Sequence, residues 1–508
     1  MILAFIYFIL FFFAVKKLSF FKDEQLTFNF LFALLIFKVF GCFLYYWIYF
    51  SYYPGSFKSD STSTMHDAYI VYSALPNHPI DYLKIIFGIH SNGELDSLYQ
   101  TYFKQIEKWG NSNSVSDFFL NDNRTSIRLH AFIMLFSFGK YAVHAFVMLA
   151  LSFIGQFAFY KTFKSFFYKK EILFAIIIFL TPSVLFWSSG VLKEPLAIFL
   201  VGIFVYTFFQ IFIHKHINAK IVLAFLGSIL FFAVLKPYII VLFIIPLILF
   251  TVVKRIEIRK ITLFYITSIV LLYGLSSVAL KFLFHRDVLH TIVNRQNDFV
   301  NLSKGGIFLT NTHKYVRLDI NDKKSILMLD SIQSTCRIKP HTKLMYWDEK
   351  NLNNLRDTIF DFDNKDSSLY HLISIIPPAG SAIKINRLEY NLQSFVTLIP
   401  QSLFNVLCRP FFYDSHSITE FMASLENLFI LIFFIYCFLN SKIKREHINF
   451  LIFLMSIVFL SYLLIGLTTT VTGAIVRYKV PFFPLLLMIP LLLLDADKIK
   501  RFQFLRKK

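Results

Sequence analysis

Eleven apolar segments, most of them long enough to cross a bilayer, constrain this chain more than any other feature. A hydrocarbon core of about 30 Å needs roughly 20 apolar residues in a helix, because backbone polar groups in lipid must be hydrogen-bonded internally. Only 16% of the 508 residues are charged, against about 25% in soluble proteins. We therefore expect an all-α polytopic membrane protein with about 11 transmembrane helices. The segments are 2–15, 26–49, 141–160, 172–189, 191–213, 221–235, 237–253, 261–281, 424–440, 447–468 and 478–495.

Two hydrophilic blocks interrupt these segments and divide the chain into five parts. The second block alternates like short β-strands at 315–320 and 326–330, with a turn expected at 321–322. Its apolar end, from residue 392 to 410, predicts a helix lying along the membrane surface. The five predicted parts are an N-terminal helix pair (1–50), a first outer block (51–140), a six-helix core (141–281), a second outer block (282–423) and three helices with a basic tail (424–508).

Lys and Arg are distributed unevenly between the short loops, which predicts the topology. Alternate short loops and the tail hold 22 of these bases, whereas the opposite short loops hold four. The first set is therefore expected to be cytoplasmic, with the N-terminus and both blocks outside and the C-terminus inside, as in a bacterial inner membrane protein. Most of the net charge of +20 then reflects topology, and we expect no nucleic-acid partner.

The sequence contains none of the common cofactor motifs. There is no Walker A loop, no glycine-rich dinucleotide loop and no zinc or haem spacing. Of the four cysteines, only Cys336 and Cys408 fall outside the predicted spans, where a bridge between them is an open alternative. We predict no cofactor and name no metal-binding residue, while a requirement for a divalent cation stays open.

The turn between the fourth and fifth segments carries charges at membrane depth, which are functional candidates by default. Lys193 is predicted to face a lipid phosphate beside Glu194, and Pro195 begins a helix whose N-terminal dipole also favours an anion. A pair of side chains reaching for the interface is the alternative. Lys236 forms a similar turn, for which an ordinary charged loop is the stronger alternative.

Positive charge outside is what topology usually avoids, so the outer bases near the last segments are further candidates. Arg477 offers a planar fork that suits phosphate, and Tyr478 and Lys479 follow it before the last segment. Arg409 follows the same reasoning ahead of the ninth segment. The alternative for all of them is a set of ordinary flanking bases.

Two carboxylates close to the membrane in the first block complete the candidate chemistry. Asp60 and Asp67, with His66 beside them, are placed to act as a general base on an acceptor hydroxyl. The alternative is a solvated loop acid. A carboxylate together with cations on one membrane face is what transfer from a lipid phosphate to an alcohol requires.

This arrangement resembles the multi-spanning C-type glycosyltransferases and related membrane proteins of bacterial polysaccharide biosynthesis. The resemblance implies a polyprenyl-phosphate- or diphosphate-linked sugar donor, a glycan or other hydroxyl acceptor, and Asp60 or Asp67 as the acid of the first outer loop. The stretches that carry it are 182–194 (PSVLFWSSGVLKE), 380–381 (GS), 409–411 (RPF) and 477–481 (RYKVP).

Three classes of function are compatible with these residues. The first is a membrane glycosyltransferase or polysaccharide polymerase acting on the extracytoplasmic face. The second is a non-catalytic membrane subunit that docks a protein partner through residues 282–423. The third, a transporter of lipid-linked saccharide, predicts charges spread through mid-membrane depth, and only Lys38 and Glu426 come near that.

Overall fold

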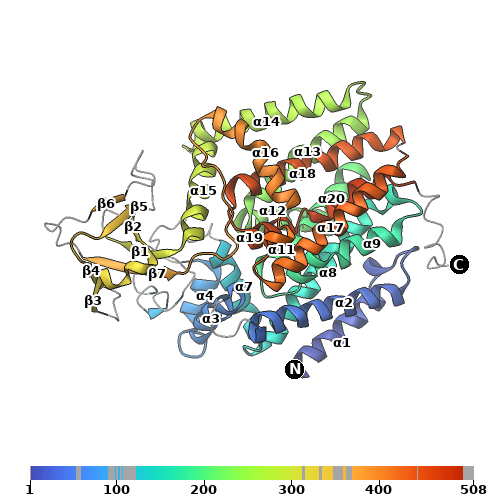
Figure 1. Ribbon diagram of the computed structural model, residues 1–508. Coiled ribbons are helices and arrows are strands. Elements are labelled where there is room, and N and C mark those ends of the chain that lie inside the picture. Colours follow the sequence, from blue (N-terminus) through green and yellow to red (C-terminus); the bar gives the residue numbers. More distant parts are fainter. Residues whose placement is uncertain are drawn as a thin grey trace. The chain divides into compact units, whose positions relative to one another are not determined.

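The computed structural model is a mainly helical protein with one antiparallel β-sheet (Figure 1). It describes residues 2–52, 59–89, 98, 101–102, 106, 122–285, 287–311, 315–330, 335–346, 359–361, 369–442 and 444–495. The chain forms two compact units. Unit 1 comprises 1–266, 430–458 and 480–508, and unit 2 comprises 267–429 and 459–479. The predicted basic tail after residue 495 lies outside the described residues.

Unit 1 contains the N-terminal and central helices together with the last one. Its long apolar helices agree with the predicted spans, while α3, α4 and α7 occupy the first hydrophilic block. The helices of unit 1 are α1 (Ile2–Lys17), α2 (Phe28–Trp47), α3 (Asp60–Ser73), α4 (Pro79–Phe87), α7 (Asp122–Ser137), α8 (Tyr141–Phe163), α9 (Glu171–Leu180), α10 (Pro182–Trp187), α11 (Lys193–Phe208), α12 (Ala219–Leu235), α13 (Pro237–Arg255) and α20 (Phe483–Leu493).

The segment expected to cross at 172–189 is two helices, α9 and α10, joined at Thr181. Pro182 lacks a backbone N–H and restricts Thr181 to an extended conformation, so α9 ends there and α10 begins with proline at its first position. The last segment is likewise interrupted, between α19 (Thr472–Lys479) and α20. A proline thus sets the position of the break between α9 and α10.

Helices α8 and α11 cross at a contact of two glycines. A Cβ atom built on Gly202 would lie 1.9 Å from the carbonyl oxygen of Gly155. No side chain fits there, so the two backbones touch directly, as small residues allow in membrane helix packing. The pair therefore fixes the central helix crossing of unit 1.

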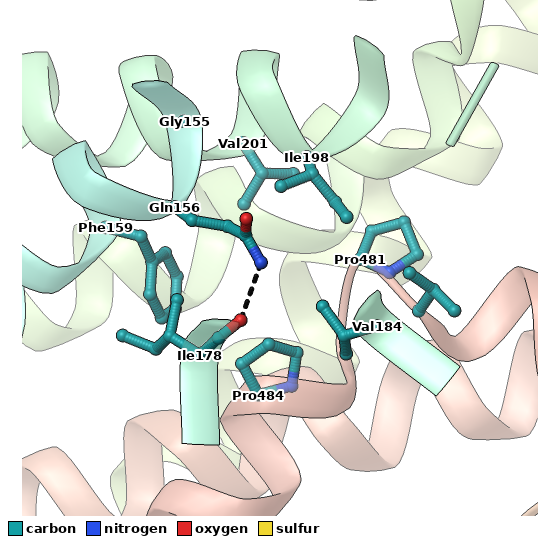
Figure 2. Close-up of a pocket in the computed structure, with 10 residues that line it drawn as sticks. Gly155, Gln156, Phe159, Ile178, Val184, Ile198, Val201, Pro481 and Pro484 are labelled. Atoms are coloured by element: carbon teal, nitrogen blue, oxygen red, sulfur yellow. Dashed lines mark hydrogen bonds between the residues drawn. The ribbon is translucent and has the colours of Figure 1, made fainter. Parts of the chain in front are cut away.

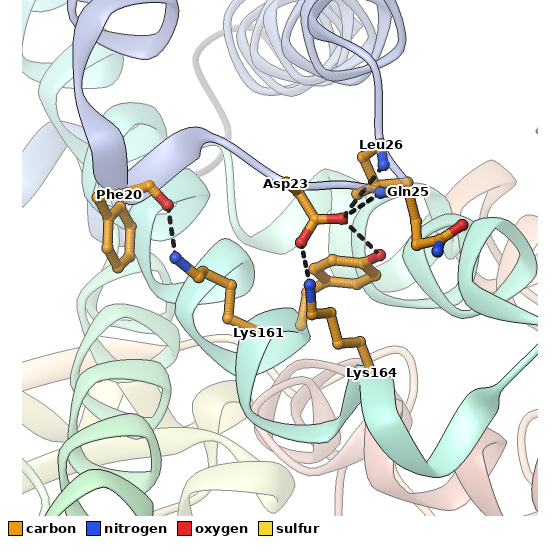
Figure 3. Close-up of polar contacts among 7 residues, drawn as sticks. Phe20, Asp23, Gln25, Leu26, Lys161 and Lys164 are labelled. Atoms are coloured by element: carbon orange, nitrogen blue, oxygen red, sulfur yellow. Dashed lines mark hydrogen bonds and ion pairs between the residues drawn. The ribbon is translucent and has the colours of Figure 1, made fainter. Parts of the chain in front are cut away.

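The loop between α1 and α2 is fastened to the end of α8 by charges (Figure 3). The Lys164 Nζ atom lies 2.5 Å from Asp23 Oδ2, and the Lys161 ammonium donates to the Phe20 carbonyl at 3.0 Å. Asp23 Oδ1 accepts from the backbone N–H groups of Gln25 and Leu26. The carboxylate thus both shapes its own turn and holds α8.

Unit 2 holds the sheet and the helices around it. Its helices are α15 (Val288–Lys304), α16 (Leu392–Cys408) and α19, with most of α14 (Ile261–Phe284) and parts of α17 (Ile418–Leu439) and α18 (Ile448–Thr468). Asn391 caps α16, whose range matches the helix predicted at 392–410. No membrane position is assigned to it, so its lying along the surface stays a prediction.

The sheet in unit 2 has the strand order β3-β4-β7-β1-β2-β5-β6, with every pair antiparallel. Alternate residues of the central strands, such as Ile307, Leu309, Val316 and Leu318, form its buried face. The strands are β1 (Gly306–Thr310), β2 (Tyr315–Leu318), β3 (Ile326–Asp330), β4 (Thr335–Ile338), β5 (Lys343–Tyr346), β6 (Ile359–Asp361) and β7 (Tyr370–Ile376).

The sequence predicts strands in this block, and the structure contains them, but the expected turn between β2 and β3 is wrong. Residues Ile320–Ser325 form a 3-10 helix that Asp319 caps. The two strands do not pair: β2 lies between β1 and β5, and β3 pairs with β4. The local pattern identified the strands, whereas their partners are set by distant parts of the chain.

Seven of the described helices are long and apolar enough to cross a membrane, or eight if α19 and α20 form one span. These are α2, α8, α11, α13, α14, α17 and α18, several with short flanking turns. The chain is therefore a multi-pass membrane protein by length and composition, and the expected count of 11 stays a prediction. All four cysteines are unbridged, so there is no disulfide between Cys336 and Cys408.

Candidate functional site

Helix α3 carries the two candidate bases, and it places them differently. Ser59 caps the helix by accepting from the backbone N–H of Thr62 at 3.2 Å. Asp60, in the first turn, is exposed. Asp67 is fully buried, and its Oδ1 atom lies 3.3 Å from Nδ1 of His66, whose side chain is 56% exposed. Asp60 is therefore accessible to solvent, whereas the buried Asp67 contacts the solvent-exposed His66.

Helix α3 packs against α7 through an apolar cluster that includes Ala68, Val71, Ile127 and Ala131. Helix α4 is fastened to α7 as well, because the Arg128 guanidinium donates to the Ile85 carbonyl at 2.8 Å. Helix α7 is thus the support on which the first block's helices rest.

Lys193, at the first position of α11, reaches the first turn of α7. Its Nζ atom lies 2.6 Å from Asp122 Oδ2 and 2.6 Å from Asn123 Oδ1. Because α3 packs on α7, the helix of the candidate base and the candidate phosphate-binding lysine have the same support. Both elements belong to unit 1, and the predicted convergence of Asp60 or Asp67 with Lys193 on one site stays a prediction.

The next residue makes a second ion pair. Glu194 Oε1 lies 3.2 Å from Nζ of Lys236, and both side chains are buried. Lys236 directly precedes Pro237, the first residue of α13. The starts of α7, α11 and α13 are therefore connected by two lysines and two carboxylates, which we call the four-charge network: Asp122, Lys193, Glu194 and Lys236.

Formal charges cancel within the four-charge network, but the helix ends add to it. The N-terminus of each helix carries about half a positive charge from aligned peptide dipoles, with N–H groups lacking intrahelical partners. Three such ends with two ammonium groups give a place where an added anion is favoured.

The remaining candidates lie in unit 2. The Lys479 ammonium donates to Asn427 Oδ1 at 3.3 Å, and the Asn427 amide donates to the carbonyls of Cys408 and Pro410, each at 3.3 Å. Asn427 thereby connects Lys479 on α19 to the turn that contains Arg409. Arg477 precedes Lys479 by two residues and Tyr478 by one, and the Tyr478 ring packs edge-on against Phe299.

The candidate cations therefore fall into two groups, Lys193 with Lys236 in unit 1 and Arg409 with Arg477 and Lys479 in unit 2. Within each group, hydrogen bonds, ion pairs or close sequence positions connect the members. Three residues that contact these cations, Asp122, Asn123 and Asn427, were not predicted from the sequence. Asn427 could have been, because it is a polar residue next to Glu426 inside an apolar segment.

Lys38 is a further buried charge, inside the candidate span α2. Its Nζ atom lies 2.7 Å from Gln156 Oε1 and 2.6 Å from Ser188 Oγ. Gln156 also donates to the Ile178 carbonyl at 2.6 Å and lines an apolar cavity of about 300 Å³ including open space, with Phe159, Val201 and Pro481 around it (Figure 2). Lys38 therefore ties α2 to α8 and to the turn after α10.

No group of three or more His, Cys, Asp or Glu suited to a metal ion occurs among the described residues. Comparisons with family models, with curated proteins and with solved structures find no match. The chemistry of the candidate acids and cations is therefore the basis for assigning a function.

Proposed function

We propose that the chain is an integral membrane glycosyltransferase or polysaccharide polymerase that transfers a sugar or glycan from a polyprenyl-(di)phosphate carrier to a hydroxyl acceptor. The observation that carries this proposal is the shared support of α3 and Lys193 by α7. It brings an acid-bearing helix and the four-charge network, with its two ammonium groups at three helix N-termini, into one compact unit.

The reaction assigns each group a role. Asp60, or Asp67 through His66, takes the proton of the acceptor hydroxyl. The hydroxyl oxygen attacks the anomeric carbon, and the bond from that carbon to the carrier phosphate breaks. Lys193 and Lys236, with the three helix ends, stabilise the negative charge that develops on the departing phosphate.

Asp122 is consistent with this role for Lys193. Before the donor binds, the carboxylate holds the ammonium in place and compensates its charge. A donor phosphate then adds negative charge where two ammonium groups already lie. Arg409, Arg477 and Lys479 would bind the same class of lipid-linked anion from unit 2.

We also propose a topology for the chain. It has eleven spans in a bacterial inner membrane, with both blocks and the N-terminus outside and the C-terminus in the cytoplasm. The uneven distribution of Lys and Arg over the loops supports this topology. Cysteine accessibility to membrane-impermeant reagents in intact cells would test each loop.

A non-catalytic subunit is the second candidate, and the sheet of unit 2 favours it. Strand β3 lies at the edge of the sheet, and Leu327, Met328 and Leu329 on it are exposed. An edge strand with exposed apolar side chains can accept a strand from a protein partner.

The deciding experiment uses the full chain in lipid nanodiscs with a panel of polyprenyl-phosphate- and diphosphate-linked sugars and hydroxyl acceptors. Release of the free carrier is followed by thin-layer chromatography. We expect Asp60→Asn, or Asp67→Asn, to reduce release at least about 100-fold, the usual contribution of a general base. Asp81→Asn, on α4 of the same block, serves as the matched control.

Lys193→Met should weaken donor binding, with Lys140→Met as an exposed control at the start of α8. Full carrier release by both Asp variants would remove the general-base assignment. No release by the wild-type chain from any donor, together with capture of one defined protein partner by β3, would favour the non-catalytic subunit.

A further inference from the structure

Four helices that lie wholly or partly in unit 2 carry a set of buried polar side chains, none of which belongs to the four-charge network. Asn405 comes from α16, Glu426 from α17, Tyr462 from α18 and Lys479 from α19. Their exposed fractions are 4%, 5%, 1% and 2%. We call these four residues the unit 2 polar cluster.

Two hydrogen-bond donors in this cluster lack an acceptor. The Tyr462 hydroxyl and the Asn405 amide nitrogen are buried and make no hydrogen bond to any residue that the structure describes. Such groups are rare in folded proteins, because burial removes the hydrogen bonds that water would supply. A Cβ atom built on Gly466 of α18 would lie 2.2 Å from the carbonyl oxygen of Ser402 on α16, so the neighbouring turns that carry Tyr462 and Asn405 are on closely packed helices. Two such donors on adjoining helix turns indicate a place where an acceptor binds.

The other members show which kind of acceptor fits. Glu426 lies within electrostatic range of both Tyr462 and Lys479. Lys479 is joined through Asn427 to the turn containing Arg409, and Arg477 lies on the same helix as Lys479. Glu420, in the first turn of α17, accepts a hydrogen bond from the Thr472 hydroxyl of α19 at 2.7 Å. The three bases and the carboxylates of Glu420 and Glu426 give a formal charge of +1 before any ligand binds.

We propose that the unit 2 polar cluster binds the phosphate group of a membrane lipid, with Asn405 and Tyr462 as two of its ligands. A phosphate has several acceptor oxygens, which match a hydroxyl, an amide and an ammonium donor at once. Tyr462 lies six residues before the end of α18, or about 9 Å along the helix. Tyr462 therefore lies in the C-terminal half of α18.

The inference does not depend on sugar transfer, since it concerns binding alone. If the lipid is the carrier, the cluster also serves the proposed function. If the lipid is an ordinary anionic phospholipid, the cluster is a separate lipid site. Both share the phosphate chemistry, and the experiment distinguishes them.

The test measures thermal stabilisation of the full chain, in detergent, by added polyprenyl phosphate, phosphatidic acid, inorganic phosphate or diacylglycerol. We expect one or both lipid phosphates to raise the Tm, and diacylglycerol, which lacks a phosphate, to have no effect. Tyr462→Phe removes one oxygen and keeps the ring, so the variant should fold. The lipid-induced rise in its Tm should fall to about half or less, because a ligand that binds more weakly stabilises the folded state less at the same concentration.

Three variants show whether Tyr462 and Asn405 contact the bound lipid. Asn405→Leu should reduce the shift like Tyr462→Phe, while Tyr436→Phe, an exposed tyrosine on α17, should leave it unchanged. The proposal is overturned if Tyr462→Phe and Asn405→Leu leave the shift at its wild-type value. It is also overturned if inorganic phosphate alone reproduces the full shift, because the site would then take a free anion.

Discussion

The Lys38 ammonium lies 2.6 Å from the Ser188 hydroxyl, and both residues are fully buried in unit 1. In the described part of the chain Lys38 makes no ion pair, and its ammonium donates to the neutral oxygens of Ser188 and Gln156. Ser188 is fixed from a second direction, because its carbonyl accepts from the Ser152 hydroxyl at 2.8 Å. The turn that leads to Lys193 and Glu194 is thereby anchored to α2 and α8.

The anchor predicts the effect of Lys38→Met. Methionine fills a similar volume but leaves the oxygens of Gln156 and Ser188 without their donor, so we expect a loss of about 1–3 kcal/mol in unfolding free energy. Thermal unfolding in detergent measures it, with Lys16→Met at the exposed end of α1 as the control. An unchanged or higher Tm would mean that desolvating the ammonium costs as much as its hydrogen bonds contribute.

Asp23 should stabilise unit 1 through two separable contributions. Asp23→Ala removes the ion pair with Lys164 and the oxygen that accepts from both N–H groups of the turn, with an expected cost of about 2–4 kcal/mol. Asp23→Asn keeps an oxygen for the N–H groups of Gln25 and Leu26, and should lose only about half of that. Lys164→Met should match the Asn variant. Equal losses in Asp23→Ala and Asp23→Asn would show that the turn contributes little.

A buried histidine pair predicts sensitivity to acid. Nδ1 of His130 lies 2.9 Å from Nδ1 of His144, so one ring must donate and the other accept. Burial, with His144 nearby, lowers the pKa of His130 to about 3. The unfolded chain takes up this proton near pH 6.5 and the folded one does not, so stability falls as pH drops from about 6.5 towards 3.

The expected slope for His130 is up to about 1.4 kcal/mol per pH unit over that window. Tm measured from about pH 7.5 to about pH 5 tests it. His130→Leu should flatten the profile, whereas His78→Leu, before α4, should keep the wild-type slope. A His130→Leu profile as steep as the wild type would assign the acid sensitivity to other groups.

The glycine contact between α8 and α11 predicts a large effect from one methyl group. Gly202→Ala would place Cβ against the Gly155 backbone, so we expect a loss of more than about 3 kcal/mol or failure to fold. Gly227→Ala on α12 is the matched control, since a Cβ atom there meets nothing within 4 Å. Alanine should be neutral or favourable at Gly227 by up to about 1 kcal/mol. Equal behaviour of the two variants would contradict the close crossing.

Features that depend on local chemistry could be predicted from the sequence. Apolar length identified the long helices, and alternation identified β2 and β3. The break of the 172–189 segment at Thr181 was not predicted, because it depended on how Pro182 ended α9. The pairing of the strands could not be predicted, because it depends on contacts between segments far apart in the chain.

The candidate residues themselves could be predicted from the sequence, whereas their contacts could not. Lys193 and Lys236 were recognisable as charges at membrane depth, but their partners Asp122 and Glu194 could be assigned only from the packed helices. Tyr462 carried no sequence signal, because a tyrosine near the end of an apolar segment is commonly an interface residue. Its missing acceptor is a property of the packing alone.

Helices α14, α17 and α18 each belong partly to unit 1 and partly to unit 2, and the chain passes between the units once more after Lys479. Neither unit is therefore a continuous stretch of sequence. No single proteolytic cut can release one of them intact, and neither can be expressed as one uninterrupted fragment. Unfolding of one unit must disturb helices of the other, which favours loss of both in a single cooperative transition.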